Sequence, residues 1–152
     1  MNRQQLAKVY VFCCSNSFDK LELIRHNLQQ GVELRVIPLP CSGKLDILYL
    51  TKAFESGADG AAVMICRNNE CQYVEGNRRA VKRAEAVGEI LDEIGVGKDR
   101  LSVIQMNGGG TEQAIRDLES FCLKIRDFTR NDKQSQQSDI LTSHLVNAEA
   151  AT

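Results

Sequence analysis

The sequence lacks several features that would assign it to a common functional class. It has no tryptophan, two prolines and two histidines among 152 residues. No apolar run approaches the roughly 18 residues that a membrane-spanning helix needs, so we expect no membrane segment. The formal net charge of -1 gives no reason to expect binding to nucleic acid. The polar start of the chain does not resemble a signal peptide, and we therefore expect a cytoplasmic protein.

The six cysteines are the residues that need an explanation. A chain of this length buries enough apolar surface to fold without disulfides. In a reducing compartment, cysteines serve more often as ligands, redox groups or buried thiols. A cysteine hydrolase would also need a histidine as a nearby base. His26 lies in an expected helix and His144 lies near the C-terminus, so hydrolytic catalysis is disfavoured.

Short apolar runs alternate with helical patterns along the first 130 residues. We expect strands at 8–13, 33–38, 60–66 and 101–106, and helices at 18–30, 44–56, 74–94 and 111–129. This alternation predicts an α/β protein with a single domain, in which helices flank a parallel four-stranded sheet. Polar residues predominate from 131 onward. We therefore expect residues 1–130 to form the domain and residues 131–152 to form a disordered, flexible C-terminal tail.

Five of the six cysteines are expected at one edge of this sheet. Parallel strands all end at the same edge, and open α/β sheets bind their ligands beyond the carboxyl ends of the strands. The first strand ends at Cys13 and Cys14, the second is followed by Cys41, and the third is followed by Cys66 and Cys71. Thiols that are far apart in the sequence should therefore lie close together in space.

Three chemistries would use such a group of thiols. Iron–sulfur clusters take four thiolates, which can come from separate segments. Structural zinc prefers cysteine pairs two to four residues apart, and only Cys66 and Cys71 form a spaced pair. A dithiol enzyme usually has C-x-x-C at a helix N-terminus, whereas Cys13 and Cys14 are adjacent. The residues alone leave open an iron–sulfur protein, a zinc- or cluster-stabilised adaptor without a redox role, and a thiol redox protein that uses Cys13 and Cys14. Cys122 has a core spacing in the last helix, and we expect it to be buried.

Three segments of the sequence carry a family resemblance. They are Pro40–Asp46, Ala53–Gly60 and Cys66–Asn77. Over residues 8–128 the chain closely resembles the iron–sulfur delta subunit family of methyl-viologen-reducing hydrogenases (MvhD/FlpD).

This resemblance implies a function. It implies a [2Fe-2S] cluster in an electron-transfer subunit that catalyses no reaction by itself. The subunit would relay electrons between an electron-donating or electron-accepting oxidoreductase and a heterodisulfide-reductase-like flavin subunit. The resemblance also implies a hetero-oligomeric anaerobic complex, of the hydrogenase or the benzoyl-CoA-reductase type.

Carried over to this chain, the resemblance places the cluster ligands on Cys13, Cys41, Cys66 and Cys71. The family pattern has C-x-x-C at the first of these positions. Here Asn16 stands where the second cysteine of that pair would be, and Cys14 has no counterpart. Cys14 is therefore a further metal-ligand candidate, either as a substitute for a family cysteine or as a bystander.

Residues beside these cysteines have expected structural roles. Gly43 either lets the backbone approach the sulfurs of the cluster or forms an ordinary turn before a helix. Asp46 is expected to cap the helix that follows it. Gly76, in the first turn of a helix, costs about 1 kcal/mol relative to alanine, which indicates close packing there. Tyr73 is expected either to shield the cluster or to pack beneath it, and packing is the favoured interpretation. A basic run is either a solvated helix face or a docking patch for an acidic partner, and it comprises Arg78, Arg79, Lys82 and Arg83.

Overall fold

The computed structural model describes residues 6–27 and 31–149. These residues contain a four-stranded sheet with the order β2-β1-β3-β4, and all three strand pairs are parallel. The strands are β1 (Ala7–Cys14), β2 (Val32–Leu39), β3 (Gly60–Ile65) and β4 (Leu101–Gln105). The predicted α/β fold with a parallel four-stranded sheet is confirmed.

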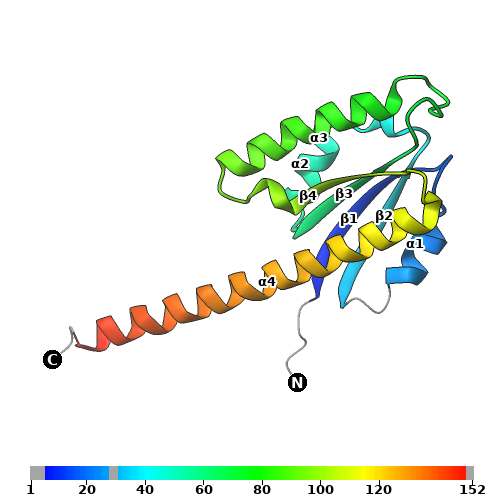
Figure 1. Ribbon diagram of the computed structural model, residues 1–152. Coiled ribbons are helices and arrows are strands. Elements are labelled where there is room, and N and C mark those ends of the chain that lie inside the picture. Colours follow the sequence, from blue (N-terminus) through cyan, green and yellow to red (C-terminus); the bar gives the residue numbers. More distant parts are fainter. Residues whose placement is uncertain (1–5, 28–30, 150–152) are drawn as a thin grey trace.

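Helices cover both faces of the sheet (Figure 1). Helices α1 (Lys20–Asn27) and α4 (Gly110–Glu149) lie on one face, and α2 (Ile47–Glu55) and α3 (Gly76–Glu93) lie on the other. Two short 3-10 helices, η1 (Ser42–Lys44) and η2 (Lys98–Arg100), precede α2 and β4. The connections that follow β1 and β3 leave toward opposite faces of the sheet. Neighbouring strands of this kind form the switch point at which open α/β sheets bind ligands.

Each face of the sheet has its own apolar layer, because successive side chains of a strand point to opposite faces. Val9 and Val11 of β1 pack with α1 and α4, whereas Tyr10 and Phe12 pack with α2 and α3. Strand β3 is buried at every position, as a central strand of a parallel sheet must be. Pro38 lies in the edge strand β2, where its missing N–H breaks no ladder.

Element boundaries differ from the predicted ones at identifiable residues. The predicted helix at 44–56 is divided into η1 and α2, because Asp46 Oδ1 accepts a hydrogen bond from the Leu48 N–H at 2.9 Å and begins α2 there. The expected capping role of Asp46 is thereby confirmed. Helix α3 begins at Gly76 because Val74 has a φ of 62°, which is incompatible with a right-handed helix. The predicted end of the first helix, at 28–30, lies outside the described residues.

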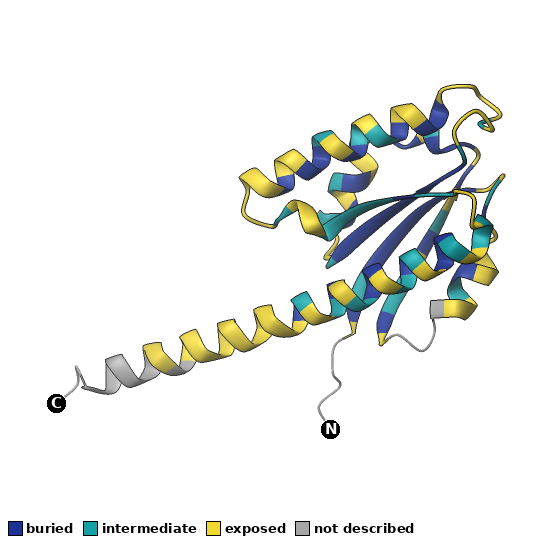
Figure 2. Cartoon of the chain, in the orientation of Figure 1, coloured by how far each residue is buried: buried dark blue, intermediate teal, exposed yellow. Residues whose placement is uncertain are grey.

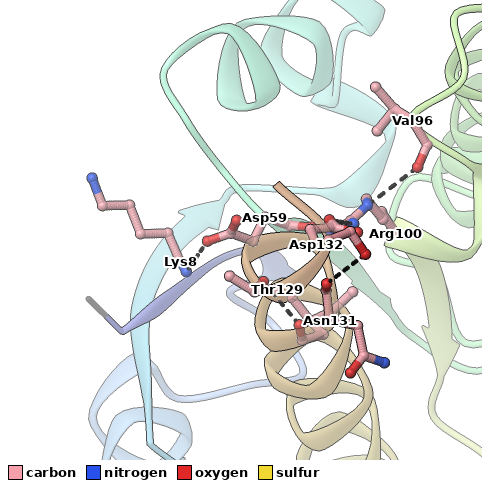
Figure 3. Close-up of polar contacts among 9 residues, drawn as sticks. Lys8, Asp59, Val96, Arg100, Thr129, Asn131 and Asp132 are labelled. Atoms are coloured by element: carbon pink, nitrogen blue, oxygen red, sulfur yellow. Dashed lines mark hydrogen bonds and ion pairs between the residues drawn. The ribbon is translucent and has the colours of Figure 1, made fainter. Parts of the chain in front are cut away.

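Helix α4 does not end near residue 129 as predicted but continues to Glu149. Its described side chains at 130–140, 142 and 143 are all exposed (Figure 2). Asp132, near the middle of this helix, forms an ion pair with Arg100 of η2 (Figure 3). Arg100 also donates hydrogen bonds to the carbonyl oxygens of Val96 at 3.2 Å and Asp59 at 3.1 Å. The division into a domain at 1–130 and a flexible tail at 131–152 stays a prediction, and residues 150–152 lie outside the described part.

None of the helices in the described part of the chain combines the length and the apolar composition that a membrane crossing requires.

The two parts of α4 should respond differently to truncation of an apolar side chain. Leu118 is fully buried and Ile140 is 57% exposed. We expect Leu118→Ala to lower the free energy of unfolding by about 2–5 kcal/mol, because it leaves a cavity under the helix. Ile140→Ala should change it by less than about 0.5 kcal/mol. Urea unfolding followed by circular dichroism measures both values. Equal losses would show that the distal part of α4 packs against the domain.

Candidate metal centre

A cavity of about 270 Å³ opens at the carboxyl edge of the sheet, and four cysteines line it. Cys14 ends β1, Cys41 follows β2, and Cys66 and Cys71 lie in the connection from β3 to α3. Cys71 is partly exposed, whereas the other three are buried, and all are free thiols. Three connections therefore bring four thiols together at the switch point between β1 and β3.

The remaining lining of this cavity is mixed in polarity. It comprises Asn16, Ser17, Glu70, Gln72, Tyr73 and Met106. Asn16 Nδ2 donates a hydrogen bond to the carbonyl oxygen of Pro40 at 2.9 Å and so links the loop after β1 to the end of β2. The side chain of Tyr73 is 59% exposed. The prediction that Tyr73 packs beneath the site is therefore wrong.

Cys13 does not line this cavity, although the family pattern makes it a predicted ligand. It is buried in the apolar layer beside Val9 and Val11, on the face that α1 and α4 cover. Neighbouring side chains on a strand point to opposite faces, so Cys14 rather than Cys13 lies with the other three cysteines. The same alternation points the thiols of Cys13 and Cys14 away from each other. Cys122 is fully buried in the same layer as Cys13, which confirms its predicted place in the core.

Two glycines allow the turn at Cys41 to contact the first turn of α3. A Cβ atom on Gly43 would lie 2.6 Å from the Cα of Gly76. A Cβ atom on Gly76 would overlap the Cys41 sulfur and lie 3.2 Å from the Cys71 sulfur. The predicted close packing at Gly76 is confirmed. At Gly43 the structure shows a close backbone contact, but the atoms approached are those of Gly76, so the expected approach to cluster sulfurs stays a prediction.

Two side chains of α3 hold the loops that carry the cysteines. Arg83 Nη1 donates hydrogen bonds to the carbonyl oxygens of Gly43 at 2.7 Å and Leu45 at 2.5 Å. Asn77 is buried, and its Nδ2 donates to the carbonyl oxygen of Arg67 at 3.1 Å. In the sequence, Arg83 belongs to a basic run, and nothing there indicates this anchoring role. A contact between residues about 40 positions apart leaves no local signal in the sequence.

Burial keeps two of the four thiols protonated in the absence of a metal. It raises the pKa of Cys66 to about 12, and the neighbouring Cys71 and Cys14 act in the same direction. Burial also raises the pKa of Cys41, although the Gly43 N–H donates to the Cys41 sulfur at 3.3 Å and opposes the increase. Such thiols lose their protons when a metal cation supplies the compensating positive charge.

Cys71 is the exception, because it lies at the N-terminus of α3. Burial acts to raise its pKa as well, but backbone N–H groups of Asn77, Tyr73 and Gly76 and the thiol of Cys66 lower it. The net result is a pKa below the ordinary value for cysteine. The orphan N–H groups of a helix N-terminus stabilise a thiolate in the same way that they stabilise other anions.

The donor set suits an iron–sulfur cluster. Ser42 Oγ and Arg67 Nε are buried and have no hydrogen-bond partner among the described residues, and each residue directly follows a cysteine of the cavity. Both groups can donate hydrogen bonds, which cluster sulfurs accept. Residues 6–27 and 31–149 contain no group of three His, Cys, Asp or Glu side chains that could hold a single metal ion. A two-iron cluster differs from such a site, because each of its irons is bound by two cysteines.

The fold and the four thiols define a class of protein: a small α/β domain that gathers free cysteines at the carboxyl edge of a parallel sheet. The sequence profile of the methyl-viologen-reducing hydrogenase delta subunits matches residues 9–129, and the chain belongs to this family. The resemblance inferred from its motifs is thereby confirmed.

Named relatives include separate iron–sulfur subunits of archaeal hydrogenases. The iron–sulfur subunit of the vhu F420-non-reducing hydrogenase of Methanocaldococcus jannaschii is 28% identical over 130 residues, which are 84% of this chain and 97% of the relative. The protein of the same name from Methanococcus maripaludis is 37% identical over 101 residues, which are 64% of this chain and 75% of the relative.

A related stretch also occurs within a much longer protein. This protein is the A subunit of the ferredoxin:CoB-CoM heterodisulfide reductase of Methanosarcina mazei, which is 32% identical over 95 residues. The match covers 62% of this chain and 12% of the longer protein. Similar domains are therefore found both as separate chains and as parts of a larger one.

Adding one methyl group at Gly76 should disrupt the thiol site without unfolding the protein. We expect Gly76→Ala to displace the sulfurs of Cys41 and Cys71 and to abolish metal uptake. Gly88→Ala on the same helix is the matched control, because its Cβ would meet Lys98 Cβ at an ordinary 3.7 Å. That control should bind metal normally and gain up to about 1 kcal/mol of stability. Metal content and thermal unfolding measure both effects, and normal metal uptake by Gly76→Ala would contradict the packing described above.

The metal-free protein should contain one unusually reactive thiol. Because the pKa of Cys71 is lowered, a larger fraction of this thiol is ionised at neutral pH than of an ordinary cysteine. We expect iodoacetamide at pH 7 to alkylate Cys71 first, whereas Cys66, with a pKa of about 12, should react only after unfolding. Peptide mass spectrometry over time measures the order. Alkylation of Cys66 before Cys71 would be the contrary result.

Proposed function

We propose that this chain is an electron-transfer subunit, without catalytic activity of its own, that holds one [2Fe-2S] cluster with Cys14, Cys41, Cys66 and Cys71. The observation that carries the proposal is the lining of one cavity by these four thiols. When bound, such a cluster accepts and returns single electrons. Cys13 is less suited to ligation, because its side chain lies in the apolar layer on the other face of the sheet.

The chain's own residues would divide the work of binding. Cys71 supplies a thiolate that the N-terminus of α3 already stabilises, whereas Cys41 and Cys66 release protons on binding. Burial of Cys14, Cys41 and Cys66 keeps water away from most of the ligand set. The unpartnered donors on Ser42 and Arg67 are suited to stabilise negative charge on sulfur, which favours the reduced state.

The relatives support a place for the chain in a larger complex. Some are named as iron–sulfur subunits of F420-non-reducing hydrogenases, and others are heterodisulfide reductase proteins that contain a similar stretch. We therefore propose that this chain relays electrons between an oxidoreductase and a heterodisulfide-reductase-like flavin subunit. The assembly would be a hetero-oligomeric anaerobic complex of the hydrogenase or benzoyl-CoA-reductase type. We place it in the cytoplasm, where reducing conditions keep the six thiols free.

Exchange of two adjacent cysteines tests the proposed ligand set. We expect the wild-type chain, reconstituted anaerobically with iron and sulfide, to bind about two irons and to be brown. After reduction it should give an EPR signal. Cys14→Ser should lose the visible absorption and the signal, because a ligand is removed. Cys13→Ser, the matched control one residue away, should keep both.

Other outcomes would favour the competing interpretations. Loss of colour with Cys13→Ser and its retention with Cys14→Ser would show that the ligand set is wrong. A colourless protein that purifies with zinc would favour an adaptor without a redox role. A metal-free protein with a reversible dithiol would favour a thiol redox protein.

A further inference from the structure

The charged side chains of α3 are distributed in the opposite way to the one that its helix dipole favours. Helices are stabilised by acidic residues near the N-terminus and basic residues near the C-terminus. In α3 the first turn contains no acidic residue and the last turn contains no basic residue. The first two turns contain instead four cations, Arg78, Arg79, Lys82 and Arg83, and the last turns contain Glu89, Asp92 and Glu93. This reversal lowers the stability of the helix, and a negatively charged partner at its N-terminus would compensate for it.

Of these four cations, Arg83 is the one whose side chain donates hydrogen bonds to the backbone of the domain, at the carbonyl oxygens of Gly43 and Leu45. Arg79 forms an exposed ion pair with Glu75 at 3.6 Å. Arg78 and Lys82 are exposed and have no ion pair among the described residues. Most of the positive charge at this end of α3 is therefore available to another molecule.

Two large apolar side chains are exposed next to these cations. Tyr73 is 59% exposed and Val74 is 80% exposed. Val74 also has a φ of 62°, a conformation that β-branched residues rarely adopt. Its N–H donates to the carbonyl oxygen of Cys71 at 3.0 Å, so this strained segment directly adjoins a thiol of the metal centre. Backbone strain of this kind is concentrated at functional sites, and here it leaves an apolar side chain exposed to solvent.

A cleft connects these features to the thiols. It has a volume of about 340 Å³ and lies between the turn at Cys41 and the segment that leads into α3. Cys41 borders both this cleft and the cavity of the metal centre. The cations in the cleft lining are Lys44 and Arg79, and the acidic residue in the lining, Glu75, is the ion-pair partner of Arg79.

We propose that these residues form a docking face for an acidic protein that carries single electrons. The face, called here the α3 entry face, consists of Lys44, Tyr73, Val74, Arg78, Arg79 and Lys82. The proposal rests on the proposed function, since it places the redox partner beside Cys41 and Cys71. An apolar centre with a charged rim is the usual anatomy of a protein interface. Complementary charge speeds the encounter and selects the orientation.

A second cationic cavity lies at the opposite edge of the sheet and provides a matched control. Its lining includes Arg126, Arg130 and residues at the start of β1 and just before β2. Arg126 is ion-paired with Asp127 at 3.2 Å, as Arg79 is with Glu75. Arg130 is exposed, as Lys44 is. Reversing the charges of Lys44 and Arg79 changes the net charge of the chain as much as reversing those of Arg126 and Arg130. The two double variants therefore differ only in the position of the change.

The test is a titration of the full chain with purified flavodoxin, an acidic flavoprotein that carries single electrons, followed by calorimetry at low ionic strength. We expect Lys44→Glu with Arg79→Glu to weaken binding about tenfold or more. Arg126→Glu with Arg130→Glu should weaken it by less than about twofold. Val74→Asp, which adds negative charge at the apolar centre, should also weaken binding. Circular dichroism confirms that each variant is folded.

Three results would overturn the α3 entry face. They are equal weakening by both double variants, binding that Lys44→Glu with Arg79→Glu leaves unchanged, and no measurable association of the wild-type chain. The titration needs no metal in the protein, so it separates this proposal from the previous one. A chain that binds flavodoxin through this face but never takes up iron and sulfide would contradict the proposed function alone.

Discussion

The contact between the backbones of Gly43 and Gly76 is the constraint on which the candidate metal centre depends. It joins the turn after β2 to the first turn of α3, and it requires that neither residue has a side chain. Because of this contact, Gly76 lies directly against the sulfur of Cys41 and close to that of Cys71. Arg83 then holds the same turn through the carbonyl oxygens of Gly43 and Leu45. The thiols therefore meet because the backbone can approach closely there.

The N-terminal end of α3 favours negative charge both toward the interior and toward solvent. Toward the interior, its backbone N–H groups lower the pKa of Cys71, while burial keeps the pKa values of Cys41 and Cys66 high. Binding of the proposed cluster would therefore be coupled to the release of protons from the buried thiols. Toward solvent, the helix carries cations that its own dipole disfavours. Both features fit a helix end selected for binding rather than for its own stability.

The topology explains why the site lies where it does. Connections leave β1 and β3 toward opposite faces of the sheet, which opens a crevice at their carboxyl ends. Cys14 and Cys66 occupy these two ends, and the turn after β2 brings Cys41 to them. All four thiols of this arrangement come from one chain, and this chain matches 97% of the length of the Methanocaldococcus jannaschii subunit. It is also compatible with insertion into a longer chain, such as the heterodisulfide reductase protein of Methanosarcina mazei.

Periodicity along the chain was enough to predict the order of the elements, the parallel sheet and the edge at which the cysteines after β1, β2 and β3 gather, although it placed Cys13 there as well. The sequence by itself also determined the family, the cap at Asp46 and the burial of Cys122. The packing of the layers shows that Cys14 lines the cavity and that Cys13 lies in the apolar layer on the other face of the sheet, since this depends on which face of β1 meets α3. The packing of the layers likewise sets the hydrogen bonds of Arg83 to Gly43 and Leu45 and the exposure of Tyr73. Local patterns record which residues repeat, whereas contacts between distant segments depend on how the layers pack.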